Sequence, residues 1–505
     1  MTKTNPHLPL FDFSRWKKHL PNPETMTDFE LNNSDSFVFK GDNLHIMKSI
    51  APVFNQKIKL IYIDPPYNTG NNKFQYDDNL ASEHWLTFME NRLRIAWDLL
   101  SHDGALFIQV DDNEFAYLKV LCDTIFGRNH CKETIVLKSS TESGVNAVNV
   151  KRGERLFKVK EYILFYTKSE NFRFKPFYTK ANYNFNYKYW VDENNKTTRP
   201  KDVLQEFYQE ALKNNPPEIA RTIAQKQLEK FALSNPEKIF SIEKNIKKAG
   251  EKFKAFAKKN KESQQIECFI NSKNLPILMF DGGTLVPLKD RIVNFQGKNH
   301  FGILASDLWV DIGTTPAKEG NVKFTNGKKP ERLLARIIEM CTNENDWVLD
   351  FFAGSGTTAA VALKMNRRFV TIEKSDYQEN DCLQRLQNVL DGEQTGVSKQ
   401  YAWKGGKSFV SAQLKSHNEN IVNVLEKLKS SEEILKLISE IEFYSQTAFD
   451  LNLSNKNTLE EMQLSLLQWL SEHPIYATES NATFDWIKNN EKDLEMNRKF
   501  YHLQT

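Results

Sequence analysis

Two kinds of hydrophobic pattern alternate along most of the chain. Some segments are short, nearly continuous apolar runs of strand length, and others carry apolar residues at helical spacing. The predicted strands lie at 37–42, 59–63, 105–110, 161–166, 347–351 and 369–373. The predicted helices lie at 43–50, 82–100, 331–340 and 357–365, and one more is capped by Asp111 or Asp112 and ends at Gly127. This alternation predicts an α/β fold, a mostly parallel sheet with helices on both faces.

The segment between about 170 and 300 breaks this rhythm. It is rich in Asn, Lys, Tyr and Phe, its stretch 181–190 alternates aromatic with polar residues, and residues 240–262 hold eight Lys against three Glu. Beyond residue 410 the chain is polar, with helical patterns at 419–442 and 459–471. The predicted organisation is an N-terminal arm with little packing of its own (1–34), a first α/β half (35–169), an inserted domain (170–300), a second α/β half (301–410) and a helical C-terminal region (411–505).

Composition sets wide limits on the class of protein. A length of 505 residues allows about three domains, and 40% hydrophobic with 26% charged residues is ordinary for a soluble globular protein. A net charge of +3 does not by itself indicate nucleic acid, so a polyanion-binding surface requires local clustering of charge. The five cysteines are scattered and favour reduced thiols over a zinc or disulfide site. No apolar run has the length of a membrane span, and we expect a cytoplasmic protein without a membrane partner.

The strand at 347–351 is followed by a turn of small residues and a helix. Glycines let the backbone pass close to a ligand, and a helix N-terminus favours the ligand's negative group. Asp350 ends this strand and Glu373 ends the next, where an acid can accept both hydroxyls of a ribose. There is no third glycine at dinucleotide-binding spacing and no P-loop lysine. The turn therefore favours a cofactor with an adenosyl group and a small zwitterionic tail over a pyrophosphate.

S-adenosylmethionine fits this description. Its carboxylate can take backbone N–H groups at the helix start, and the ring of Phe352 suits a place beside the sulfonium or the adenine. Taken alone, Gly354 and Gly356 fit equally well a tight strand–helix turn with Phe352 in the core. The candidate cofactor residues here are Asp350, Phe352, Ala353, Gly354, Ser355, Gly356, Thr357 and Glu373.

Asp64-Pro65-Pro66-Tyr67 follows the apolar run 59–63 directly. The lone pair of an adenine amine is delocalised into the ring, so a catalyst must hold the N–H protons where that lone pair becomes tetrahedral. Asp64 and a backbone carbonyl fixed by Pro65 supply two acceptors, and Tyr67 supplies a stacking face. The amine is inaccessible inside a duplex, so the base must be flipped out; no metal is needed. The alternative is that Pro-Pro only ends the strand and Asp64 caps the turn, but the extension Asn68-Thr69-Gly70 disfavours it.

The two motifs together resemble those of the β class of amino DNA methyltransferases. In that class an Asp-Pro-Pro-Tyr motif precedes the target-recognition domain, which precedes a Phe-x-Gly-x-Gly motif. Asp64 to Gly70 and Phe351 to Thr358 carry the likeness here. More closely, the chain is similar to the modification subunits of type III restriction–modification systems. The supporting stretches are 85–89, 109–114, 328–334 and 396–409, within a likeness over roughly 36–168 and 305–410.

The resemblance implies a doubly wound, mixed seven-stranded sheet and N6-adenine methylation with S-adenosyl-L-methionine. It implies that Asp64, Pro65, Pro66 and Tyr67 are catalytic and that Asp42 contacts the cofactor adenine. It also implies double-stranded DNA, a second copy of the chain in a homodimer, and a helicase–nuclease restriction subunit as partners. The inserted domain is then expected to read the DNA, and the C-terminal region to serve assembly. Gly405-Gly406-Lys407 stands where the family usually has three glycines.

Three alternatives remain open. A solitary or type II β-class adenine methyltransferase keeps the chemistry and drops the restriction subunit. An N4-cytosine methyltransferase is disfavoured, because the cytosine enzymes that the chain resembles usually carry Ser where it has Asp64. A DNA specificity subunit without catalysis is disfavoured by the intact Asp64 and Tyr67. For the lysines of 240–262, phosphate contacts compete with an ordinary solvated helix face, and no target sequence follows from side-chain identity alone.

Overall fold

The computed structural model divides the chain into two compact units. One unit holds Met1–Lys175 with Asp307–Thr505, and the other is Pro176–Ser306. The latter overlaps the segment in which the sequence rhythm is broken. The residues that the structure describes are 10–22, 24–27, 29–68, 82–140, 156–191, 199–244, 249–295, 298–313, 318–322, 327–374, 382–445, 458–472, 475–476, 497 and 500.

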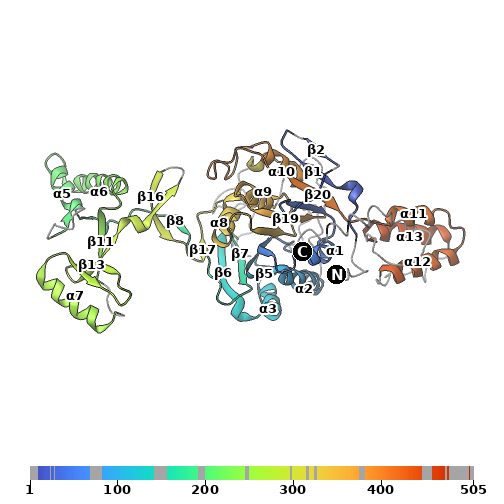
Figure 1. Ribbon diagram of the computed structural model, residues 1–505, viewed down its shortest axis with the longest axis horizontal. Helices are drawn as coiled ribbons and strands as arrows, with labels where there is room; N and C mark the ends of the chain where they lie inside the picture. The colour runs from blue at the N-terminus through green and yellow to red at the C-terminus, as the bar shows by residue number, and fades with distance from the viewer. Residues whose placement is uncertain are drawn as a thin grey trace. The chain divides into compact units, whose positions relative to one another are not determined.

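An eleven-stranded mixed sheet forms the centre of the first unit (Figure 1). The stretch from β5 to β20 is parallel throughout, whereas β7 runs antiparallel to both of its neighbours. The expected α/β class is confirmed. In spatial order the strands are β17 (Leu308–Trp309), β6 (Cys131–Lys138), β7 (Lys160–Thr167), β5 (Leu100–Val110), β4 (Ile58–Ile63), β18 (Trp347–Asp350), β19 (Arg368–Glu373), β3 (Phe37–Lys40), β20 (Phe409–Gln413), β1 (Lys17–His19) and β2 (Thr25–Met26).

The sheet holds more strands than the seven that the family resemblance implied. Seven contiguous strands, from β6 to β3, make up the central part. Beyond them, β20 pairs with β3 and β1 pairs with β20, while the two-residue β17 extends the opposite edge along β6. The strands beyond these seven are short, and their sequences contain no long apolar run.

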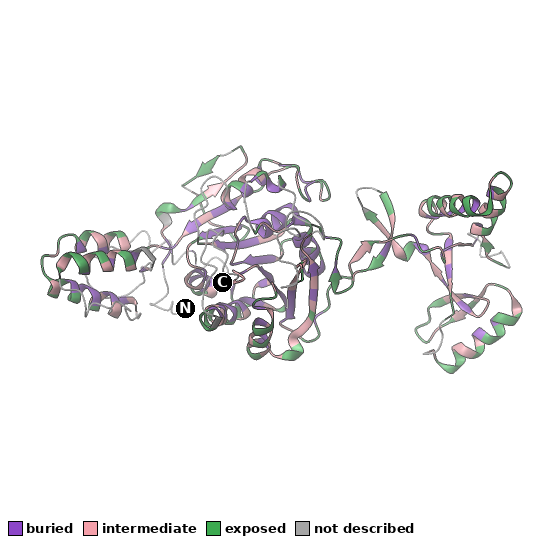
Figure 2. Cartoon of the chain, turned by 180° about the vertical axis from the view of Figure 1, so that it is seen from behind, coloured by how far each residue is buried: buried purple, intermediate pink, exposed green. Residues whose placement is uncertain are grey.

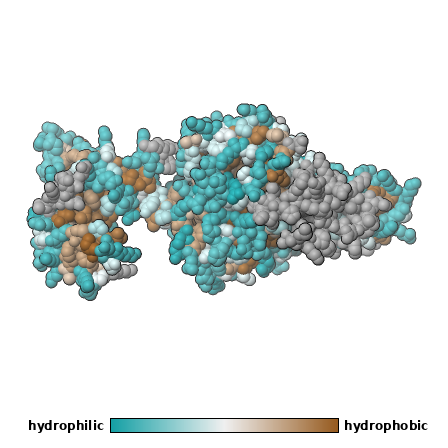
Figure 3. Space-filling model, viewed as in Figure 1, coloured by the Kyte–Doolittle hydropathy of each residue, from teal (hydrophilic) through white to brown (hydrophobic). Residues whose placement is uncertain are grey.

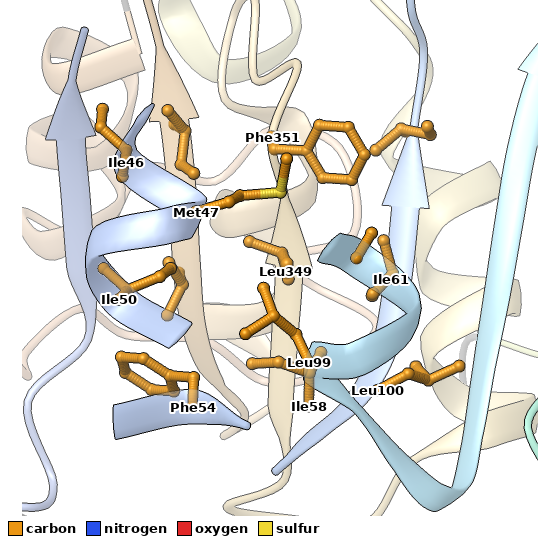
Figure 4. Packing of buried hydrophobic residues seen from close by; sticks show 14 of the residues in the cluster. Ile46, Met47, Ile50, Phe54, Ile58, Ile61, Leu99, Leu100, Leu349 and Phe351 are labelled. Carbon is orange, nitrogen blue, oxygen red and sulfur yellow. The ribbon is translucent and has the colours of Figure 1, made fainter. Parts of the chain in front are cut away.

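Helices cover both faces of this sheet (Figure 1). Met47, Ile50 and Phe54 of α1 pack beside Leu349 of β18 (Figure 4). The central strands are buried almost throughout, which explains their nearly continuous apolar sequence (Figure 2). One face carries α1 (Asn43–Phe54), α2 (Ser82–Leu99) and α3 (Phe115–Phe126), and the other carries α8 (Glu331–Cys341), α9 (Thr357–Lys364) and α10 (Cys382–Leu390).

Two sequence expectations about this unit are wrong. The N-cap of α3 is Glu114, and Asp111 instead accepts the N–H of Asn113 at 2.8 Å, in a turn that precedes the helix. The N-terminal arm is not loosely packed: Phe11 and Trp16 are buried in the main core. Their rings lie 5.1 and 5.6 Å from the ring of Phe500, so residues from both ends of the chain cover the same part of the core.

The C-terminal region forms three helices, α11 (Asn418–Leu425), α12 (Ser431–Ser445) and α13 (Leu459–Glu472). They share a hydrophobic cluster of their own, in which Ile421 and Leu425 are buried. Val424 and Leu428 pack against that cluster. These four apolar residues therefore pack within the chain, because α12 and α13 supply their apolar partners.

The inserted unit contains a six-stranded sheet, a three-stranded sheet and helices α5 (Val203–Leu212), α6 (Pro217–Ser234) and α7 (Glu251–Ser263). The visible face of this unit mixes hydrophilic and hydrophobic residues (Figure 3). The sheets follow the orders β10 (Lys201–Asp202), β9 (Tyr189–Trp190), β11 (Ile239–Glu243), β14 (Gly283–Pro287), β13 (Pro276–Phe280), β12 (Glu267–Ile270), and β15 (Ile292–Phe295), β16 (Lys298–Leu304), β8 (Tyr178–Lys180).

The aromatic stretch 181–190 builds the core of this unit. Tyr183 and Tyr187 are buried, and the Tyr183 hydroxyl donates to the Tyr187 carbonyl at 2.5 Å. Phe185 and Trp190 pack against the same cluster. Tyr183 and Tyr187 are therefore not available to stack on bases, since the core of the unit needs their side chains.

Candidate active site

The two sequence motifs meet at one edge of the main sheet. Strands β4, β18, β19 and β3 are consecutive and parallel, so their carboxyl ends lie together. Asp64 directly follows β4, Asp350 ends β18, Glu373 ends β19, and Asp42 lies two residues beyond β3. In open α/β sheets, ligands bind outside the carboxyl ends of the strands. The sheet thus brings the predicted catalytic and cofactor residues to a common edge.

Asp64 lies in a cluster of polar side chains that is largely shielded from solvent. The hydroxyl of Tyr67 donates a short hydrogen bond to Asp64 Oδ1 and also lies 3.0 Å from Glu161 Oε2. The side chains of Asp64 and Glu161 are each 18% exposed. A second carboxylate therefore stands beside the predicted one, separated from it by the phenol.

Lys329 connects this cluster with the glycine turn. Its Nζ lies 3.2 Å from Asp64 Oδ1, 3.0 Å from Glu161 Oε2 and 2.9 Å from the Tyr67 hydroxyl. Its backbone carbonyl accepts a hydrogen bond from Thr357 Oγ1, at the start of α9, at 3.3 Å. One residue from the segment before α8 thus contacts both halves of the site.

Buried polar residues on the strands support Glu161. Gln109 donates to Glu161 Oε2 at 2.5 Å, and the hydroxyl of Tyr62 donates to Gln109 Oε1 at 2.5 Å. Tyr62 and Gln109 are each 1% exposed. None of these four residues, Lys329, Glu161, Gln109 and Tyr62, was predicted from the sequence as a site residue. A polar residue inside an apolar strand run, as Gln109 is, was the available signal, because such a residue is normally buried with a partner.

The charges of the cluster depend on one another. Burial raises the pKa of Asp64 to about 6; Lys329 opposes this rise and Glu161 adds to it. Burial pushes the pKa of Glu161 upward as well, but Lys329 and the hydrogen-bond donors around it outweigh burial and leave that pKa below its usual value. Burial would lower the pKa of Lys329, but the two carboxylates hold it above its usual value. At neutral pH the cluster therefore holds two carboxylates and one ammonium.

The loop after Asp64 is fixed by two further contacts. The indole N–H of Trp85 donates to the Pro66 carbonyl at 2.8 Å. Asn68 has a φ of 56°, and its side-chain amide donates to the buried Glu114 at 2.9 Å. These contacts hold the peptide that follows Pro65 and limit the movement of Tyr67. The rest of the predicted extension, Thr69 and Gly70, lies outside the described residues.

The glycine turn is held by two acids from neighbouring strands. Asp350 is buried; its carboxylate accepts the N–H of Phe352 at 3.0 Å and the hydroxyl of Thr358 at 2.6 Å. Glu373 is half-buried and accepts the N–H of Gly354 at 2.7 Å. Gly354 has a φ of 50°, which disfavours a side chain there. Asp350 therefore holds the turn from inside, whereas Glu373 lies at its surface.

The second half of the turn packs inward. Gly356 has a φ of 72°, and a Cβ there would lie 2.5 Å from Cys382 Sγ. Ser355 and Thr357 are buried, and Ala353 is 7% exposed. Their predicted contribution to a cofactor site is therefore limited to backbone groups, and for Gly356 the tight-turn interpretation accounts for the glycine. Phe352, half-buried, lies with its ring 6.0 Å from that of Phe88.

A buried group of charges lies under the turn. Arg385 donates to Thr357 Oγ1 at 2.8 Å and to Glu331 Oε1 at 2.9 Å. Lys364 pairs with Glu331 at 2.8 Å and also with Glu393. These side chains are almost fully shielded, so each charge depends on its partners. They tie the start of α9 to α8 and α10.

Asp42 caps helix α1. Its carboxylate accepts the N–H groups of Leu44 and His45 at 3.0 and 3.4 Å and pairs with Arg92 at 3.0 Å. The N–H of Gly41 donates to the backbone carbonyl of Glu373 at 3.0 Å, which places Asp42 beside the end of β19. Its side chain remains 20% exposed. Asp42, Phe352 and Glu373 thus each have a partly exposed side chain at this edge.

The chain matches known DNA-modifying proteins along most of its length. A family model described as DNA methylase covers residues 58–382. The chain is 33% identical to the probable type III restriction–modification enzyme HindVI Mod subunit of Haemophilus influenzae, over 93% of this chain and 68% of that protein. The chain belongs to the type III Mod subunits. It is also 28% identical to the type III EcoP15I Mod subunit of Escherichia coli, over 69% of this chain and 58% of that protein.

The expected Mod family and its reaction class, the methylation of DNA, are thereby confirmed. Two solved structures resemble the chain at low identity. One is a DNA modification methylase of Thermus thermophilus complexed with S-adenosyl-L-methionine, at 16% identity, TM-score 0.34, and covering 69% of this chain and 92% of that one. The other is the PvuII cytosine-N4-specific DNA methyltransferase, at 13% identity, TM-score 0.38, and covering 74% and 95%.

Two kinds of feature are missing from the described part of this Mod-family chain. No helix there combines the length and apolarity needed to cross a membrane. Within the same residues, no group of three or more His, Cys, Asp or Glu side chains is arranged to hold a metal ion.

Methyl transfer by this Mod-family chain should fall as the pH is lowered through about 6, the pKa to which burial raises Asp64. A protonated Asp64 loses acceptor strength, so the single-turnover rate should drop about tenfold per pH unit below that value. Cofactor binding measured at each pH is the control, because burial also raises the pKa of Asp350, to about 7. If the rate stayed constant down to one pH unit below the pKa of Asp64, the ionisation of Asp64 would not control methyl transfer.

Proposed function

We propose that this chain transfers a methyl group from S-adenosylmethionine to the exocyclic N6 of an adenine flipped out of double-stranded DNA. The observation that carries the proposal is the position of Asp64 and Tyr67 at the same sheet edge as the glycine turn. A base held by the first motif is then within reach of a cofactor held by the second. The family relationship supports the same reaction class.

The residues at the ends of β18, β19 and β3 fit S-adenosylmethionine. The half-buried Glu373, which ends β19 and holds the N–H of Gly354, suits ribose hydroxyls because a carboxylate there can accept from both of them. Asp42 can accept from an adenine amino group, and the half-buried Phe352, whose ring lies 6.0 Å from that of Phe88, offers an aromatic surface. The cofactor supplies a methyl group on a sulfonium centre.

The polar cluster suits an amine that becomes positively charged during the reaction. Asp64 accepts an N–H of the target amine, and that hydrogen bond strengthens as charge develops on nitrogen. Glu161 contributes a second negative charge close by. The Tyr67 ring gives the base a stacking surface, and its hydroxyl, bonded to Asp64, fixes the carboxylate in place. After transfer, the extra proton passes from N6 to the Asp64 carboxylate, which accepts that N–H, and from the partly exposed Asp64 to solvent.

N4-cytosine methylation is the second candidate. The PvuII enzyme, named as cytosine-N4-specific, is similar to this chain at an identity too low to assign a base. Asp64 favours adenine because the resembling cytosine enzymes usually carry Ser at this position. A specificity subunit without catalysis would not need the Asp64, Tyr67 and Glu161 cluster to be assembled and bonded as it is.

Asp64→Ala and Glu373→Ala should separate chemistry from cofactor binding. Asp64→Ala should lower the transfer of labelled methyl groups into duplex DNA at least about a hundredfold, because it removes a fixed acceptor. Its affinity for S-adenosylmethionine, measured by calorimetry, should stay near that of the wild type. Glu373→Ala should weaken that affinity about tenfold through lost hydrogen bonds. Label found only on cytosine would contradict the assignment of the base. If Glu373→Ala kept the wild-type affinity for the cofactor, the cofactor site would not lie at this edge of the sheet.

The inserted unit supports a DNA-reading role through the exposed lysines of α7. Lys252, Lys258 and Lys259 are exposed on this helix, whereas Lys254 pairs with Glu251 at 2.9 Å. Ala257 and Asn260 anchor the opposite side of the helix in the unit. Of the other lysines expected to contact phosphates, Lys247 and Lys248 lie outside the described residues.

Replacing Lys252, Lys258 and Lys259 by Gln should weaken DNA binding and flatten its salt dependence. The slope of log K against log salt should fall by about 0.9 for each phosphate contact that is lost. The matched control replaces three exposed lysines of the C-terminal region, Lys427, Lys429 and Lys436, and should leave the slope unchanged. If both triple variants gave the same slope of log K against log salt, the lysines of α7 would not contact phosphates.

Assembly as a homodimer that also binds a helicase–nuclease restriction subunit is part of the same proposal. The relatives are named as subunits of larger enzymes, and this chain spans little more than half of the EcoP15I subunit. In the C-terminal region, Leu435 and Leu464 remain 48% and 68% exposed after the helices have packed. Exposed apolar side chains of this kind are candidates for subunit contacts.

Light scattering of the full chain should give the mass of a dimer. Leu435→Glu with Leu464→Glu should shift the mass toward the monomer, because the charges would have to be buried at the contact. Val120→Glu on α3, which replaces a residue 65% exposed, is the matched control and should leave the dimer intact. A monomeric wild type would contradict the homodimer, and a dimeric double variant would place its contact elsewhere.

A further inference from the structure

The ammonium of Lys329 occupies the acceptor set that a target amine requires. Its Nζ lies within 3.2 Å of Asp64 Oδ1, the Tyr67 hydroxyl and Glu161 Oε2. An ammonium has three N–H donors, and these three oxygens account for all of them. An exocyclic amine entering the same space would present donors to the same oxygens.

One carboxylate oxygen of Asp64 is fully occupied in this arrangement. Asp64 Oδ1 receives the Tyr67 hydroxyl and also lies next to Lys329 Nζ. A carboxylate oxygen offers about two lone-pair sites, so a third donor at Oδ1 requires one of the present donors to leave. Tyr67 is held by its loop, whereas Lys329 ends in a flexible four-carbon stem.

Lys329 also lies beside the ring on which a base would stack. Its Nζ is 5.0 Å from the centroid of the Tyr67 ring, within the range of a cation–π contact, and 2.9 Å from the hydroxyl, so it lies at the hydroxyl end of that ring. The same side chain thus contacts the hydrogen-bond acceptors and the rim of the stacking ring. At 14% exposure, this side chain still reaches solvent, so it has a route out of the site.

We propose that Lys329 holds the place of the target amine in the base-free enzyme and is displaced when the base enters. The inference rests on the proposed function. In the base-free enzyme, Lys329 neutralises part of the charge of Asp64 and Glu161 and keeps Tyr67 in position. Base entry moves the ammonium off Asp64 and off the Tyr67 ring, while Glu161 can retain it.

The exchange makes Lys329 a specificity-determining residue. A base with an exocyclic amine replaces the donors that the lysine withdraws, so the acceptors remain paired. A base without that amine offers Asp64 no donor, so the lysine stays on the acceptors and they remain paired in that complex as well. Without the lysine, only a base with the amine can pair these buried acceptors, so a variant lacking Lys329 should discriminate more strongly between the two kinds of base. A lysine that merely joins the two halves of the site would affect all bases equally.

Binding of two DNA duplexes tests the inference. Both carry the site that the wild-type enzyme methylates, identified by sequencing its product; one has adenine at the target position and the other has purine, which lacks the amine. The wild type should bind the adenine duplex more tightly, and Lys329→Met should increase the preference for the adenine duplex about tenfold, because nothing then pairs the acceptors in the purine complex. Lys328→Met, which removes the neighbouring charge, should keep the wild-type ratio.

Three outcomes would overturn the inference: an unchanged or reduced preference for adenine in Lys329→Met, an equal change in binding to both duplexes, or the same increased preference in Lys328→Met. Lys329→Gln, which keeps an amide donor on a shorter stem, provides a second variant if Lys329→Met does not fold. Its preference for adenine should lie between those of the wild type and Lys329→Met, and a wild-type preference would again overturn the inference. Failure of the proposed function is distinguishable, because the wild type would then methylate no adenine in the first place.

Discussion

The parallel pairing of β4 with β18 is the interaction on which the site depends. Leu60 and Ile61 lie opposite Val348 and Leu349 across the two strands, although the whole inserted unit separates them along the chain. Side chains alternate between the two faces of a strand, so a slip of one residue would turn the buried apolar residues of β4 toward the wrong layer. The tight burial of both strands therefore fixes the register, and the register places Asp64 beside the end of β18.

The polar cluster follows from the same constraint. Two carboxylates close to one another in a shielded place require a cation, and Lys329 supplies it from the segment before α8. The residue thus couples the geometry of the first motif to the start of α9. The charged group under the turn, centred on Glu331, Lys364 and Arg385, supports the other side of the same helix.

The sequence predicted the parts of the fold that depend on local pattern. Buried parallel strands are nearly continuous apolar runs, so β4 and β19 were visible, and the acids that end them were found as candidates. Lys329 and Glu161 were missed because their significance arises only when distant segments meet. The burial of Tyr183 and Tyr187 was missed because an alternating aromatic pattern does not say whether a face meets a core or a ligand. The cap of α3 was misplaced because either Asp could initiate a turn, and the chain makes one turn before the helix begins.

The pairing of the two ends of the chain has a consequence for biosynthesis. Phe11 exchanges backbone–side chain hydrogen bonds with Asn497, at 2.8 and 3.0 Å and a separation of 486 residues, and its ring packs on Phe500. At a translation speed of ~5–20 residues per second, the N-terminal aromatic residues wait roughly 25 to 100 s for these partners to be made. During that time the ribosome-bound chain exposes an apolar surface that is covered in the finished protein. A chaperone can bind this surface only during that interval.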